Sequence, residues 1–202
     1  PMSRLSLDGV ACLPLDPVNL EIAPGECVAV HGPSGSGKTL LLRALADLDP
    51  HQGRVRLDGR EQSELPGPRW RRRVGLLPAE SAWWAERVGE HFPGDPGAML
   101  EALGLDPRCM DWEVSRLSSG ERQRLALARL LAGEPEVLLL DEPTANLDAD
   151  NTARVEALVG AYRREHGAAV LWVSHDPEQR RRVAARRFLI RERRLVEERP
   201  WT

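Results

Sequence analysis

Four short apolar runs divide the chain and predict buried β-strands. Each run is apolar on both faces through its middle, which is typical of strands inside a mostly parallel sheet. The runs are CVAVHG, RVGLLP, EVLLLDE and AAVLWVSH, at residues 27–32, 73–78, 136–142 and 168–175. Segments with helical periodicity separate them, at residues 37–47, 120–132, 150–165 and 177–186. This alternation predicts an α/β core with helices on both faces of the sheet.

Three other parts of the chain have different patterns. The early stretch RLSLDGVACLPLDPVNLEI, residues 4–22, also predicts strands. The stretch PHQGRVRLDGRE, residues 50–61, contains two turn glycines and predicts a short antiparallel hairpin. Residues 80–116 are rich in tryptophan, glycine and proline and predict a single helix at about 96–104. We interpret this last stretch as part of a small helical insertion.

The composition fits one domain of this kind. The chain has 202 residues, 42% hydrophobic residues and a net charge of −3, which suit a single domain. We expect its core to consist of 1–79 and 133–202, with a helical subdomain at about 80–132. No apolar run is long enough to span a bilayer, so any membrane role is expected to be peripheral. Nothing at the N-terminus resembles a signal peptide. The three cysteines lack metal-ligand spacing, which favours reduced thiols in a cytosolic protein.

The run GPSGSGKT has the spacing of a phosphate-binding loop and lies between a predicted strand and a predicted helix. Its glycines let backbone N–H groups turn inward around a β-phosphate, and the following helix presents its positive end to the anion. Lys38 adds a charge for the β- and γ-phosphate oxygens, and Thr39 offers a hydroxyl to Mg²⁺. A glycine–serine turn that happens to precede a lysine is the weaker alternative. The expected nucleotide-binding residues are Gly32, Pro33, Ser34, Gly35, Ser36, Gly37, Lys38 and Thr39.

Polar residues follow two more of the buried strands. The run VLLLDE ends on Asp141, which suits water-mediated binding of Mg²⁺, and on Glu142, which suits polarisation of an attacking water. An aligned general base accelerates a reaction by roughly 10²–10⁴. The run VLWVSH ends on His175, whose imidazole can reach a γ-phosphate. Since ligands of open parallel sheets bind beyond the carboxyl ends of the strands, we expect these groups to converge with the phosphate-binding loop. Surface acids and a surface histidine are the structural alternatives.

The stretch LSSGERQ begins a predicted amphipathic helix. Ser118 or Ser119 can cap this helix, with Glu121 in its first turn, so that the helix N-terminus around Gly120 forms a second anion site. An ordinary N-cap is the alternative.

Four motifs in a fixed order carry a resemblance to a known family. GPSGSGKT is followed by LSSGERQ, then by VLLLDEPTANLD and finally by VSHD. This order resembles the ATP-binding cassette (ABC) ATPases, and the resemblance covers essentially residues 3–198. It implies a P-loop NTPase core with a mostly parallel sheet, N-terminal antiparallel strands and a small inserted helical subdomain. It also implies ATP and Mg²⁺ as cofactors.

The resemblance further implies a partner and a role for each motif. In the family, two cassettes stack head to tail, and the LSSGERQ-type motif of one contacts the γ-phosphate held by the phosphate loop of the other. The second anion site therefore serves the ATP of a neighbouring chain, expected here in a homodimer, and ANLD (145–148) matches the loop that couples the two sites. The expected catalytic residues are Glu142, His175 and Lys38, the metal ligands are Thr39 and Asp141, and the residues that contact the partner's ATP are Ser118, Ser119 and Gly120.

Several positions depart from the family pattern. Where the family has a glutamine that touches Mg²⁺ and water, this chain has Ala79 followed by Glu80. Either Glu80 substitutes for that glutamine or coupling runs differently. The aromatic residue that stacks on adenine is missing, because nothing before Trp70 is aromatic; Leu13 or a neighbour is expected to pack on the base less specifically. Ser119 replaces the usual first glycine of the signature, and the helical insertion is short.

Trp83 and Trp84 follow the altered position, in a stretch that borders the docking groove for the membrane subunit in transporters. Adjacent side chains cannot share one face, so at least one tryptophan is expected to be exposed. We predict that they dock a permease; plain packing is the alternative.

The arginine-rich stretch at 178–195 is interpreted as a solvated face, and contact with a membrane surface or nucleic acid is the weaker alternative. No direct nucleic-acid partner is expected.

These features together predict the ATP-hydrolysing subunit of an ABC transporter, which works beside a separate permease at the cytoplasmic face of the cell membrane. Two alternatives differ in class. A non-transport ABC ATPase of repair, translation or assembly is expected to carry long coiled-coil insertions or paired cassettes, and a small-molecule kinase has no use for LSSGE. Among family members, the chain looks most like the iron-export cassettes of bacteria.

Overall fold

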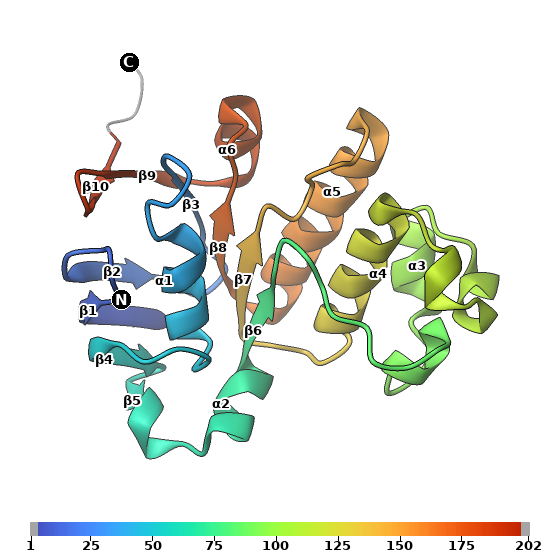
Figure 1. Ribbon diagram of the computed structural model, residues 1–202, viewed down its shortest axis with the longest axis horizontal. Coiled ribbons are helices and arrows are strands. Elements are labelled where there is room, and N and C mark those ends of the chain that lie inside the picture. Colours follow the sequence, from blue (N-terminus) through green and yellow to red (C-terminus); the bar gives the residue numbers. More distant parts are fainter. Residues whose placement is uncertain (1–3, 199–202) are drawn as a thin grey trace.

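The central sheet of the protein contains the four predicted buried strands. The structure, a computed structural model, describes residues 4–198 (Figure 1). Its six-stranded sheet has the order β10-β9-β3-β8-β7-β6. All neighbouring strands in it run parallel except β10, which is antiparallel to β9. The predicted strands are β3 (Cys27–His31), β6 (Val74–Leu77), β7 (Val137–Asp141) and β8 (Ala169–Val173).

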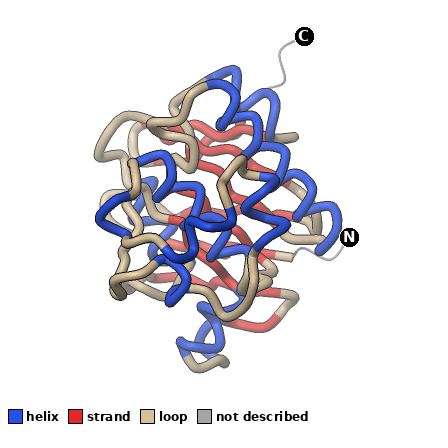
Figure 2. Tube along the Cα trace, turned by 90° about the vertical axis from the view of Figure 1, so that its right-hand side faces the viewer, coloured by secondary structure: helices blue, strands red, loops and turns tan. Residues whose placement is uncertain are grey.

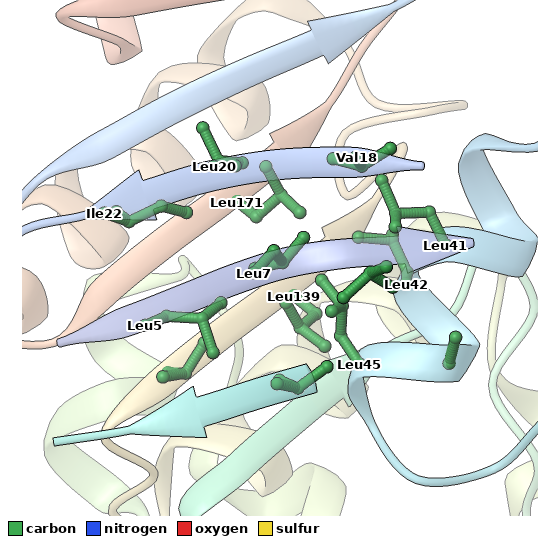
Figure 3. Packing of buried hydrophobic residues seen from close by; sticks show 14 of the residues in the cluster. Leu5, Leu7, Val18, Leu20, Ile22, Leu41, Leu42, Leu45, Leu139 and Leu171 are labelled. Atoms are coloured by element: carbon green, nitrogen blue, oxygen red, sulfur yellow. The ribbon is translucent and has the colours of Figure 1, made fainter. Parts of the chain in front are cut away.

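The N-terminal strands and the predicted hairpin form a second, antiparallel sheet with the order β2-β1-β4-β5. Its strands are β1 (Leu5–Ala11), β2 (Val18–Ile22), β4 (Gln52–Leu57) and β5 (Arg60–Glu61). Helix α1 (Lys38–Leu45) packs Leu41, Leu42 and Leu45 between the two sheets, as Figure 3 shows. Residues of both sheets and of α1 therefore share one apolar cluster, which includes Leu5, Leu7, Leu41, Leu42, Leu45, Leu139 and Leu171.

The other predicted helices are also present, and both α3 (Gly97–Ala102) and α6 (Pro177–Val183) are shorter than expected. The remaining two are α4 (Ser119–Leu131) and α5 (Ala149–His166). The helix predicted at 177–186 ends at Val183, and the chain then forms β9 (Arg186–Arg191) and β10 (Arg194–Glu197). The interpretation of 178–195 as a solvated face is therefore wrong in part, because Phe188 and Ile190 are buried against β3 and the core.

Helix α2 (Gly67–Arg73) was not indicated by the sequence pattern. It begins with Gly-Pro, which resembles a turn, and only Trp70 of its seven residues is buried. The Trp70 indole N–H donates to the carbonyl of Leu45 at 2.8 Å and so attaches α2 to the end of α1.

The helical insertion lies beside the central sheet, in front of the strands in Figure 2. Besides α3 and α4 it contains short 3₁₀ helices at Val88–His91, Pro107–Asp111 and Val114–Arg116; another, Gln62–Glu64, follows β5. Leu100, Leu103 and Leu125 of α3, its C-cap and α4 share a second apolar cluster with β7, β8 and α5. None of the described helices combines the length and the apolar composition needed to cross a bilayer.

Four charged side chains connect the two sheets at the start of β7. Arg73 at the end of α2 donates to Glu136 at 2.6 and 2.9 Å, and Arg4 lies 3.3 Å from the same carboxylate. Asp58, which follows β4, lies 2.9 Å from Arg4 and 3.4 Å from Arg73. The hydrogen bond from Arg73 lowers the pKa of Glu136 despite its partial burial. The folded protein therefore favours the ionised carboxylate.

We expect Glu136→Gln to lower the free energy of unfolding by about 1 kcal/mol at neutral pH, because it weakens a partly buried ion-pair network. A lowered pKa in the folded state contributes stability above the ordinary pKa of about 4.5, and this contribution is lost as the pH falls through the folded-state value. Urea unfolding at several pH values should therefore show the difference from wild type shrinking below that point. Glu192→Gln, at an exposed position, serves as the control. A difference that does not depend on pH would contradict this account.

Candidate active site

The loop between β3 and α1 needs glycine at two positions. Gly37, the N-cap of α1, has a φ of 101°, and a Cβ there would lie 2.9 Å from Leu15 Cγ. Gly32 has a φ of 156°, and a Cβ there would lie 2.9 Å from the carbonyl oxygen of Ile190. Any side chain at these positions would push the loop away from its neighbours. Glycine at these two positions therefore sets the path of the loop backbone between β3 and α1, and anion binding by this loop stays a prediction.

The Lys38 side chain lies folded over this loop. Its ammonium group donates to the carbonyl oxygens of Gly32 at 2.7 Å and Pro33 at 2.8 Å, and the residue is buried. Burial lowers the pKa of Lys38, while the negative charges of Glu142 and Asp141 oppose this shift. The lysine is thus a charged donor fixed at the mouth of the loop, where a phosphate oxygen can be bound.

Thr39 and Asp141 bring β7 against the phosphate-binding loop. The Thr39 hydroxyl donates to Asp141 Oδ2 at 2.7 Å, and Asp141 is buried at the end of β7. Mg²⁺ prefers oxygen ligands and keeps several waters and phosphate oxygens in its coordination shell, so that one or two protein oxygens suffice. The hydroxyl and carboxylate at this place fit that requirement.

Glu142 and His175 face each other across the ends of β7 and β8. His175 Nε2 lies 3.2 Å from Glu142 Oε1, and the backbone N–H of His175 donates to Glu142 Oε2 at 3.4 Å. Glu142 has a φ of 49°, and its own N–H donates to the carbonyl of Val173 at 3.1 Å. Burial raises the pKa of Glu142 and Asp141 raises it further, whereas His175 and Lys38 lower it. The result is a carboxylate with greater basicity than an exposed one.

These groups line one cavity of about 270 Å³. Ala79 also lines it, whereas the neighbouring Glu80 is exposed and is not part of the lining. Glu80 therefore does not take the place of the family's glutamine in this arrangement. The lining residues are Ser34, Gly35, Gly37, Lys38, Thr39, Leu40, Ala79, Asp141, Glu142 and His175.

Ser118, Ser119 and Gly120 do not line this cavity. Ser118 is the N-cap of α4 and forms a capping box with Glu121, in which Ser118 Oγ accepts from the Glu121 N–H at 3.3 Å. Both serines are exposed, and a Cβ on Gly120 would lie 3.1 Å from a methyl carbon of Leu147, in the loop that follows β7. The second predicted anion site is thus an outward-facing helix N-terminus.

No phenylalanine, tyrosine or tryptophan is among the described residues that line the groove at Leu13, although the imidazole of His51 lines it. Leu13 is 80% exposed and lines an open groove of about 650 Å³ together with Leu15, Pro17 and Arg193. Pro14 and Leu15 lie against Gly37, so this groove begins next to the phosphate-binding loop. Packing of Leu13 or a neighbour on the base of the nucleotide therefore stays a prediction.

The two adjacent tryptophans differ in exposure, as expected. Trp84 is 71% exposed, whereas Trp83 is half-buried. The guanidinium of Arg129 lies 4.6 Å from the ring centre of Trp83 and 4.8 Å from that of Trp84, and His91 meets both rings edge-on. Trp84, His91 and Arg129 line a groove of about 320 Å³ that runs beside β6 and α4. No acidic side chain is among the described residues that line it.

The structure also places functional candidates that the sequence did not indicate. Arg124 of α4 is buried and donates to the carbonyls of Gly120 and Leu103 and to the side chain of Asn151. Gln179 of α6 is buried against Thr144, near Glu142. An arginine or glutamine within a helical pattern normally faces solvent. No local sequence signal therefore indicates that Arg124 and Gln179 are buried.

Comparisons with known proteins agree on one family. A family model described as ABC transporter matches residues 15–145. The aliphatic sulfonates import ATP-binding protein SsuB 2 of Paracoccus denitrificans is 40% identical over 184 residues, which cover 88% of this chain and 71% of that protein. The Fe(3+) ions import ATP-binding protein FbpC of Streptomyces coelicolor is 38% identical over 218 residues, which cover 98% and 62%. The dimeric post-hydrolysis structure of the ATP-binding cassette MJ0796 bound to ADP and Pi has a TM-score of 0.82 at 25% identity and covers 98% and 100%.

Proposed function

The chain belongs to the ABC transporter family as an ATP-binding and ATP-hydrolysing subunit, and we propose that two copies of it build each catalytic site together. The family membership favours this function over a repair or translation factor and over a small-molecule kinase. Both relatives named above are import proteins with unlike cargoes, an organic sulfonate and iron. We therefore assign the choice of cargo to the membrane subunit. The resemblance to iron-export cassettes remains a prediction that neither relative tests.

One observation carries the proposal of a shared site. The cavity contains the phosphate-binding loop, the two carboxylates and His175, but it lacks Ser118, Ser119 and Gly120. Those three residues begin α4 as an anion site that faces outward. A second copy placed head to tail would bring its α4 N-terminus to the open side of the cavity. The γ-phosphate of ATP would then be held between the two chains, which explains why the protein carries two anion-binding helices.

Within the cavity, each side chain has a separate task. Lys38 and the loop N–H groups bind the β- and γ-phosphates and compensate their charge. Glu142 accepts a hydrogen bond from the attacking water and withdraws its proton as the oxygen approaches phosphorus. His175 beside Glu142 orients this carboxylate and donates to a γ-phosphate oxygen. The raised pKa of Glu142 makes it a better proton acceptor than an exposed carboxylate.

The oxygen atoms of Thr39 and Asp141 are the proposed Mg²⁺ ligands. Thr39 would bind the ion directly, and Asp141 would hold a coordinated water while it accepts the Thr39 hydroxyl hydrogen bond of 2.7 Å. When bound, the ion would supply positive charge that compensates the negative charge of the β- and γ-phosphate oxygens. Ala79 offers no ligand on its side of the cavity.

The groove beside Trp84 is the proposed docking site for the membrane permease. Apolar residues such as Leu76 and Leu130 line it together with Trp84, while Arg72 and Arg129 make it basic. A permease segment with an apolar face and at least one carboxylate would complement this surface. The chain would then work at the inner face of the membrane and be held there by its partner.

We expect Glu142→Gln to bind ATP but to hydrolyse it at least about 100-fold more slowly, because an amide of the same shape cannot accept the proton. The variant should accumulate as a dimer in excess ATP. Phosphate release and analytical ultracentrifugation measure the two effects. Glu80→Gln, beside the cavity but outside its lining, should keep the wild-type rate. Normal turnover by Glu142→Gln would show that Glu142 is not the base.

We expect Trp84→Ala to reduce permease co-purification from native membranes by about tenfold or more, because an exposed aromatic anchor carries much of the binding energy of an interface. Trp83 is left unchanged because it is half-buried. Leu48→Ala, which removes another exposed apolar side chain, is the matched control, and basal phosphate release should be unchanged in both variants. Undiminished co-purification of the permease with Trp84→Ala would exclude this groove as the docking site.

A further inference from the structure

One buried side-chain amide connects α6 with α5, with β8 and with the turn after β7. Gln179 of α6 is only 1% exposed. Its Nε2 donates to Thr144 Oγ1 at 2.8 Å and to Glu156 Oε1 of α5 at 3.0 Å, while its Oε1 accepts from Trp172 Nε1 of β8 at 3.3 Å. Thr144 lies in the loop that follows β7. The amide therefore uses both its donor and its acceptor within the protein.

This amide joins the two segments that carry the proposed catalytic pair. Thr144 lies two residues after Glu142, and Gln179 lies four residues after His175. The segment after Glu142 is a turn rather than a strand or helix, and Glu142 itself has a left-handed φ of 49°. The backbone hydrogen bonds from Ala145 N–H to the Glu142 carbonyl at 3.0 Å and from Leu147 N–H to the Thr144 carbonyl at 3.2 Å lie within this turn and do not join it to α6. The contact between Thr144 and Gln179 supplies a connection from this turn to α6.

We propose that Gln179 is a positioning residue for hydrolysis. It holds the turn after β7 and the helix after β8 at a fixed distance from each other. His175 Nε2 therefore stays 3.2 Å from Glu142 Oε1. Gln179 does not line the cavity and has no contact with substrate. The inference rests on the roles proposed above for Glu142 and His175.

The surrounding groups explain why an amide is needed at this position. Trp172 can only donate, and Glu156 is an acceptor that is already paired with Arg182 at 2.8 Å. Leucine at 179 would leave the indole N–H of Trp172 without its acceptor and would remove one of the hydrogen bonds that Glu156 accepts. Glutamate at 179 would still accept from Trp172, but it would place two carboxylates about 3 Å apart. These two substitutions disturb the network in different ways.

A double-mutant cycle on kcat with saturating ATP and Mg²⁺ tests the inference. The four proteins are wild type, Gln179→Leu, His175→Ala and the double variant. We expect Gln179→Leu to lower kcat about tenfold in the wild-type background and less than about twofold in the His175→Ala background, because both changes disable the same pair. The Kd for ATP should change less than kcat. Equal fold losses in both backgrounds would overturn the inference.

Gln179→Glu gives a readout that a purely structural role would not change. At high pH the two carboxylates repel each other, whereas at lower pH a shared proton restores the missing donor. We expect the kcat of Gln179→Glu, relative to wild type at the same pH, to rise between about pH 8 and pH 5, because one pKa of two adjacent carboxylates is strongly raised. The same ratio for Gln179→Leu should stay flat. A flat ratio for Gln179→Glu would overturn the inference.

The control and the proposed function are tested separately. Gln62 is a buried glutamine that donates to the carbonyl of Ala44, away from the cavity. Gln62→Leu should lower the thermal unfolding midpoint and leave kcat unchanged; an equal loss of kcat would overturn the inference. If His175→Ala alone keeps the wild-type kcat, the proposed function fails together with this inference. If His175→Ala lowers kcat and the two losses multiply, only the role of Gln179 fails.

Discussion

The parallel arrangement of β3, β8 and β7 is the constraint on which the site depends. Because these strands are neighbours in the sheet and run in the same direction, the loops after them leave at one edge. A hydrogen bond of 2.7 Å joins Thr39, in the first turn of α1, to Asp141 at the end of β7. Glu142, directly after β7, faces His175, which follows β8. Segments more than 100 residues apart in sequence therefore supply the groups proposed for phosphate binding and acid–base chemistry.

In the proposed head-to-tail dimer, the same arrangement gives each chain half of a site. The sheet edge gathers the groups proposed to bind the triphosphate and to activate the attacking water, while the N-terminus of α4 lies outside the cavity that these groups form. Leu147, in the turn after β7, lies against Gly120 at the start of α4. This turn thus contacts the N-terminus of α4, which is proposed to bind the partner's nucleotide. Through Thr144 and Gln179 it also contacts α6, the helix that follows His175. This contiguity gives a physical route for coupling the two sites of a dimer.

The sequence predicted the parts of the structure that depend on local pattern. Doubly apolar runs identified the buried strands, and the spacing of GPSGSGKT predicted the turn between β3 and α1, because both depend on neighbours in the chain. It missed β9, whose buried Phe188 and Ile190 are surrounded by arginines, and α2, which begins like a turn. It also gave no sign of Gln179, because a buried amide in an arginine-rich helix is defined only by tertiary contacts. The roles of Ser118, Ser119 and Gly120 required the family resemblance, since the helix N-terminus itself is an ordinary cap.

Mixing two inactive variants tests the shared site most directly. Lys38→Ala disables the phosphate loop, and Ser118→Asp keeps a good N-cap while it places a negative charge against a partner's γ-phosphate. In a mixed head-to-tail dimer, the intact loop of one chain meets the intact α4 N-terminus of the other. The account predicts that an equal mixture recovers up to about a quarter of wild-type phosphate release. A mixture no more active than its two components would contradict it.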